Sequence, residues 1–134
     1  MTHLLDTHAW NQRALGIGLP PLVEQTMAMQ ADSLAIADIS LWEAVELVEL
    51  GRLELSVPLA EFFRLAVTPE LTMLPVSPAI AERVATLEAS GLHKDPAEQL
   101  IVATALIHRL TLISDDSRIR QWAGVPILWK TFRK

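Results

Sequence analysis

A chain of 134 residues, half of them hydrophobic and a fifth charged, has the size and composition of one globular domain. The absence of cysteine excludes disulfides and thiolate metal sites, and the net charge of −5 argues against a protein that coats nucleic acid through overall positive charge. We expect a single domain over residues 1–134 with no membrane span and no secretory leader, and therefore a cytoplasmic protein.

Short apolar segments alternate with longer helical patterns along the whole chain. The expected strands are residues 3–6, 34–37, 72–76, 110–114 and 125–129. The expected helices are residues 20–31, 40–50, 58–67, 78–89, 95–109 and 115–122. Strands that alternate with helices predict an α/β fold of three layers, in which helices cover both faces of a central parallel sheet.

Acidic side chains fall directly after the expected strands or in the first turns of the expected helices. In a parallel sheet these positions meet at one edge, where ligands bind. Several carboxylates on one edge repel each other unless a cation neutralises them, and an all-oxygen ligand set suits Mg²⁺ or Mn²⁺. Such an ion can activate water and stabilise a phosphodiester under attack. The candidate acids are Asp6, Glu43, Asp95, Glu98, Asp115 and Asp116.

Each acid also has a purely structural interpretation, because carboxylates cap helix N-termini. Two pairs fit a capping box, Ser40 with Glu43 and Asp95 with Glu98. Asp115 precedes the last expected helix and is a candidate cap for it. Asp6 is the exception, since we expect no helix for it to cap in the residues that follow. Asp38 is expected to be a surface acid of a loop.

Other residues add less information about the chemistry. His8 and His93 lie near the acids in the sequence and are candidates to line the same cleft, with their roles open. The chain has no glycine-rich phosphate loop, no serine nucleophile motif and no paired-histidine zinc spacing. ATP hydrolysis, dinucleotide chemistry and serine acyl transfer therefore lack their usual motifs.

Four segments, in this order and at roughly this spacing, resemble the motifs of PIN domains. They are Leu-Leu-Asp-Thr-His at 4–8, Ile-Ser-Leu-Trp-Glu at 39–43, His-Lys-Asp-Pro-Ala-Glu at 93–98 and Thr-Leu-Ile-Ser-Asp-Asp at 111–116. Residues 51–55 and 124–128 also resemble connecting segments of the branch that includes VapC-type toxins. The resemblance implies a five-stranded parallel sheet and a Mg²⁺- or Mn²⁺-dependent endoribonuclease that leaves 5′-phosphate and 3′-hydroxyl ends. It also implies an RNA substrate, frequent homodimers and, in toxin–antitoxin pairs, inhibition by a small antitoxin protein.

The resemblance also implies which side chains hold the metal. Asp6, Glu43, Asp95 and Asp116 match the metal-binding acids of the family and are the expected catalytic residues. Glu98 stands where many relatives have an aspartate and is the fifth expected metal ligand. The segment 9–13 is more polar than the usual apolar run, which leaves the first helix of the family uncertain here.

The last part of the chain is basic. Residues 1–116 carry 6 basic and 16 acidic side chains, or −10, whereas residues 117–134 carry 5 basic side chains and no acid, or +5. We expect this tail to contact an RNA backbone; a solvated tail without a ligand is the alternative. The basic residues are Arg118, Arg120, Lys130, Arg133 and Lys134.

The expected helices 40–50 and 58–67 are apolar on more than one face. We interpret this surface, Val48 and Phe62 included, as a groove for an antitoxin segment or a second copy of the chain; the alternative is that both helices are simply buried. Two rival functions also stay open at this point. One is a PIN-like binding module that has lost hydrolysis, and the other is a structural α/β domain without an active site.

Overall fold

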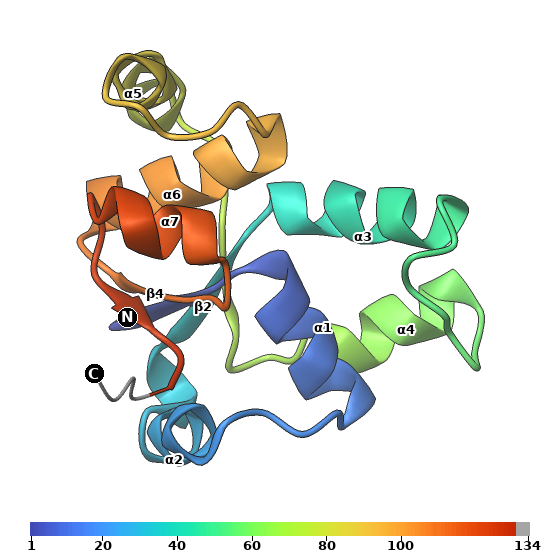
Figure 1. Ribbon diagram of the computed structural model, residues 1–134. Coiled ribbons are helices and arrows are strands. Elements are labelled where there is room, and N and C mark those ends of the chain that lie inside the picture. Colours follow the sequence, from blue (N-terminus) through green and yellow to red (C-terminus); the bar gives the residue numbers. More distant parts are fainter. Residues whose placement is uncertain (131–134) are drawn as a thin grey trace.

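The computed structural model describes residues 1–130, and residues 131–134 lie outside the described part. At its centre is a parallel sheet with the strand order β3-β2-β1-β4-β5 (Figure 1). The chain moves outward from β1 first to β2 and β3 on one side, and later to β4 and β5 on the other. The strand order therefore reverses at β1, which places a ligand site beyond the carboxyl ends of β1 and its neighbours. The strands are β1 (His3–Leu5), β2 (Leu34–Ala37), β3 (Thr72–Leu74), β4 (Thr111–Ile113) and β5 (Ile127–Leu128).

Helices cover both faces of this sheet, as predicted. Successive strand residues point to opposite faces, so that Leu4 and Leu112 pack on one side while Leu5 and Ile113 pack on the other. The first side is covered by α5, α6 and α7, and the second by α1, α2, α3 and α4 (Figure 1). The helices are α1 (Thr7–Leu15), α2 (Pro21–Met29), α3 (Ile39–Glu49), α4 (Leu59–Ala66), α5 (Pro78–Ala89), α6 (Pro96–His108) and α7 (Ser117–Trp122), with a 3₁₀ turn at Ala31–Ser33. Within residues 1–130 none of these helices has the length and the apolar run needed to cross a bilayer.

One helix, α1, was not expected from the residues themselves. It begins directly after β1, and Asp6 caps it by accepting a hydrogen bond from the backbone N–H of Ala9 at 2.8 Å. The expectation that no helix follows Asp6 is therefore wrong. Trp10 is fully buried in α1, but Asn11 beside it is buried as well, so the polar and apolar residues do not separate into two faces.

Most apolar side chains of α3 and α4 pack into the core, and only a few are exposed. Phe62 is 1 % exposed and packs against Trp10, with 5.9 Å between the ring centroids. The indole N–H of Trp10 donates to the backbone oxygen of Ala66 at 2.9 Å and joins α1 to α4. The prediction that Phe62 lines a groove is therefore wrong, and for this residue the buried alternative holds. The large apolar side chains that remain exposed on these helices and the residue after them are Trp42, Leu50 and Leu65.

We predict that Phe62→Ala lowers the free energy of unfolding by about 3–5 kcal/mol, because it empties a fully packed site between α1 and α4. Leu65→Ala on the same helix is the matched control; Leu65 is 57 % exposed, and we expect a change within about 0.5 kcal/mol. Chemical denaturation of both variants measures the difference. Equal costs for the two variants would contradict the packing described here.

Candidate active site

The carboxyl ends of β1 and β4 open into one cleft of about 510 Å³. Its walls come from the first turns of α1, α6 and α7, the length of α3 and the loop after β4. All five acids expected from the sequence line it, although they lie on four separate segments of the chain. The acidic side chains of the cleft are Asp6, Glu43, Glu46, Asp95, Glu98, Asp115 and Asp116.

Asp6 lies deepest, at the junction of β1 and α1. It is only 4 % exposed, and this burial raises the pKa of its carboxyl group. Hydrogen bonds with Ser114 and with the N–H of Ala9 oppose that rise. Ser114 is itself fully buried and directly follows β4, the strand that pairs with β1. The central pair of strands therefore holds this carboxylate in position.

Glu43 enters the cleft from α3. Burial raises the pKa of its carboxyl group, and a hydrogen bond with Thr7 opposes the shift. The predicted capping box is wrong, because α3 begins at Ile39 and Ser40 lies inside the helix. The hydroxyl of Ser40 is fully buried and lies 2.9 Å from the Thr7 hydroxyl, which ties α3 to α1. Glu43 is thus free of a capping role and faces the other acids.

Asp95 and Glu98 come from the start of α6. Asp95 caps this helix as predicted, since its Oδ1 accepts the N–H of Glu98 at 3.2 Å. The Glu98 side chain does not reach back to complete a capping box; its Oε2 lies 3.0 Å from Nε2 of His93. Burial, followed by a hydrogen bond with Asp116, raises the pKa of Glu98 to about 9. His93 therefore belongs to the site, and the buried Gln99 amide holds its backbone oxygen at 3.2 Å.

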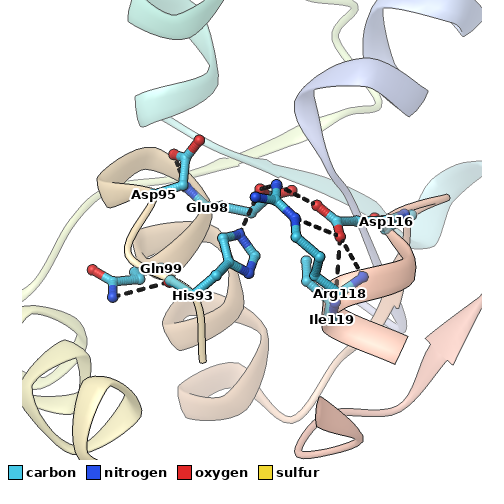
Figure 2. Close-up of polar contacts among 8 residues, drawn as sticks. His93, Asp95, Glu98, Gln99, Asp116, Arg118 and Ile119 are labelled. Atoms are coloured by element: carbon cyan, nitrogen blue, oxygen red, sulfur yellow. Dashed lines mark hydrogen bonds and ion pairs between the residues drawn. The ribbon is translucent and has the colours of Figure 1, made fainter. Parts of the chain in front are cut away.

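Asp116 and Arg118 complete the cleft from α7 (Figure 2). Asp116, and not Asp115, caps this helix, because its Oδ1 accepts the N–H of Arg118 at 2.7 Å. Asp115 is exposed at the mouth of the cleft. Burial alone would raise the pKa of Asp116, but hydrogen bonds from the Arg118 side chain and from Glu98 lower it to about 2.

Arg118 belongs to the basic segment identified in the sequence, but it was not among the expected residues of the cleft. Its Nη2 lies 3.2 Å from Glu98 Oε2 and 3.1 Å from Asp116 Oδ2. The signal that could have found it is its place in the first turn of α7, two residues after a site acid. Of the remaining tail residues, Lys130 is exposed at the end of the described part, and Arg133 and Lys134 lie outside it.

The side chains in the cleft suit a hard divalent cation. One ligand atom from each of His93, Glu98 and Asp116 can lie within 4.8 Å of the others. Asp6 and Glu43 are carboxylates whose charged forms are penalised by burial, and a cation beside them would offset that penalty. Carboxylate oxygens without cysteine match the ligand preference of Mg²⁺ and Mn²⁺. The metal-binding role of each acid remains a prediction.

Comparison with known proteins agrees with this geometry. The family model of the PIN domain matches residues 4–125, a range that contains all five acids. Ribonuclease VapC22 of Mycobacterium tuberculosis is 31 % identical over 124 residues, which cover 89 % of this chain and 90 % of that protein. A toxin–antitoxin complex from Klebsiella pneumoniae contains a chain 26 % identical, with a TM-score of 0.65 over 95 % of this chain and 96 % of that one.

A further solved structure shows the same fold at low sequence identity. VapBC2 from Rickettsia felis, bound to a DNA fragment from its promoter, has a TM-score of 0.72 at 16 % identity, over 97 % of this chain and 100 % of that one. The five-stranded parallel sheet, the acidic cleft at its carboxyl edge and the family match over almost the whole length agree. The chain belongs to the PIN-domain family.

Proposed function

We propose that this protein is an endoribonuclease that hydrolyses RNA phosphodiester bonds with Mg²⁺, or Mn²⁺ in its place, and that it is the toxin of a toxin–antitoxin pair. The observation that carries the proposal is the convergence of five carboxylates from four segments in one cleft. The similarity to a protein of nearly equal length named as a ribonuclease supports the same activity. A binding module without hydrolysis has no need for this set of acids, which disfavours that alternative.

In this proposal Asp6, Glu43, Asp95 and Asp116 hold the metal directly or through water, and Glu98 joins them. The ion would supply a Lewis acid that activates water and stabilises the charge of the attacked phosphate. Glu43 stands across the cleft from α6 and α7 and orients the attacking water or accepts its proton. Ser114 and the backbone of α1 keep Asp6 in place during the reaction.

We predict that Asp6→Asn abolishes RNA cleavage in Mg²⁺ and in Mn²⁺ without unfolding the protein. Asparagine is an equally good N-cap, so α1 should survive, and the loss of a buried charge should leave the metal-free variant at least as stable as the wild type. Cleavage of a mixed single-stranded RNA and a melting curve in EDTA measure the two effects. Wild-type cleavage by this variant would remove Asp6 from the site.

Glu43→Gln should reduce cleavage by about 100-fold or more, because it removes a charge at the metal while keeping the shape of the side chain. Glu46→Gln is the matched control: it lies on the same helix and lines the same cleft, but it is outside the proposed ligand set. We expect the control to keep its cleavage rate within about threefold. A similar loss in both variants would indicate a general effect of charge and not a specific role of Glu43.

The metal-free protein should lose stability as the pH rises. Glu98 has a pKa of about 9 in the folded chain against an ordinary value of 4.5, so the folded state keeps a proton that the unfolded state releases. Its contribution is complete below about pH 4.5 and is lost progressively up to about pH 9. Melting temperatures in EDTA across this range measure the slope. Glu98→Gln stays neutral and should flatten it, and an unchanged slope would contradict this protonation.

The antitoxin in this proposal binds along the edge of the same cleft. Leu47 and Leu50 line the cleft beside the acids, and Leu50 is 59 % exposed. An antitoxin segment with apolar side chains here could place an arginine on the carboxylates and compete with the metal. We predict that Leu50→Glu weakens binding of the antitoxin encoded beside this chain by at least about tenfold without lowering the melting temperature. Unchanged antitoxin binding would place the partner on another surface.

We also propose that the chain forms a homodimer. Sedimentation of the purified chain without antitoxin tests this proposal.

A further inference from the structure

Arg118 reaches from the first turn of α7 over two of the proposed metal ligands (Figure 2). A single nitrogen, Nη2, lies 3.2 Å from Glu98 Oε2 and 3.1 Å from Asp116 Oδ2, so it bridges the two carboxylates. Nε of the same side chain donates to Asp116 Oδ1 at 3.4 Å. The guanidinium therefore lies where a cation bound to both acids would compete with it.

The carboxylate oxygens that contact Arg118 also have other hydrogen-bond partners. Asp116 Oδ1 also accepts the backbone N–H groups of Arg118 and Ile119, because it caps α7. Glu98 Oε2 lies close to His93 Nε2 as well. A metal held by Asp116 and Glu98 would draw on the same carboxylate oxygens that Arg118 contacts, and its charge would repel the guanidinium beside it. Metal binding would therefore compete with these contacts and favour displacement of the Arg118 side chain.

The displaced side chain remains at the cleft. The backbone of Arg118 is held by the cap on Asp116, whereas its side chain is 59 % exposed and can rotate. A guanidinium presents several N–H donors in one plane, which matches the oxygens of a phosphate group. Once the two acids are occupied by metal, their negative charge no longer opposes an anion beside Arg118.

We propose that Arg118 exchanges partners during the working cycle: it pairs with Glu98 and Asp116 in the metal-free protein and binds an RNA phosphate once Mg²⁺ holds those two acids. This inference rests on the proposed function and adds to it a substrate-binding residue. In this proposal Arg118 opposes metal binding and assists RNA binding. Its removal should therefore strengthen the binding of Mg²⁺ and weaken the binding of RNA.

Arg52 provides the matched comparison. It lines the same cleft from the loop after α3 and carries the same charge. Among residues 1–130, however, the ion pairs to Glu98 and Asp116 come from Arg118 and His93. Loss of Arg52 removes one positive charge from the cleft without removing a direct competitor of the metal.

The first experiment titrates Mg²⁺ without RNA and follows the melting temperature of the wild type, Arg118→Ala, Arg118→Lys and Arg52→Ala. We expect Arg118→Ala to bind Mg²⁺ roughly fivefold or more tightly than the wild type, because a bound competitor has been removed. Arg52→Ala should change the Mg²⁺ affinity less. The Mg²⁺ affinity of Arg118→Lys should fall between those of the wild type and Arg118→Ala. An equal gain in Arg118→Ala and Arg52→Ala would show only a general effect of charge and overturn the exchange.

The second experiment measures RNA cleavage at saturating Mg²⁺. Arg118→Ala should lose at least about tenfold in kcat/KM despite its tighter metal binding, because the phosphate has lost its guanidinium partner. Cleavage as fast as wild type would show that Arg118 is only a counterion and overturn its role with RNA. If the wild type shows neither Mg²⁺ binding nor cleavage, the proposed function itself fails, and this outcome is distinct from either result for Arg118.

Discussion

Acidic side chains at the carboxyl edge of the sheet repel one another across the cleft. Parallel strands end at one edge, and here their ends and the following helices bring five acids into one cleft. Burial costs free energy for the charged forms of Asp6, Glu43 and Glu98 and raises their pKa values, and neighbouring acids add to this effect. Burial acts in the same direction on Asp116, but hydrogen bonds from Arg118, which also contacts Glu98, help to lower its pKa to about 2. The same cost makes the site favourable for a divalent cation.

The capping and metal-binding interpretations of the acids are compatible. Asp6, Asp95 and Asp116 each cap a helix through Oδ1, which accepts a backbone N–H of the first turn. The second oxygen of each carboxylate takes no part in these caps, and in Asp116 it faces Arg118. A cap fixes the side chain without using all of its ligand capacity. Each helix start therefore fixes the position of a carboxylate that lines the cleft and leaves its second oxygen outside the cap.

Prediction from the sequence succeeded where the signal was local and strong. The apolar strands, the proline-marked start of α6 and the positions of the acids after strand ends were all readable from the chain. It failed for α1, because the buried Asn11 beside Trp10 hides the helical pattern. It also failed for the Ser40 capping box, because the helix starts at Ile39, two residues earlier than the motif requires, and the Ser40 hydroxyl contacts Thr7 instead.

The order and spacing of the acids along the chain determined the fold family and the composition of the cleft, because strand ends of a parallel sheet must meet at one edge. Sequence alone could not decide how those acids share protons, since the pKa values of Glu98 and Asp116 depend on burial and on each other. The sequence suggests His93 as a residue of the cleft but not its contact with Glu98, and it does not suggest that Arg118 reaches Glu98, 20 residues away in the chain. Tertiary structure decided these contacts, because side-chain electrostatics act across space and not along the sequence.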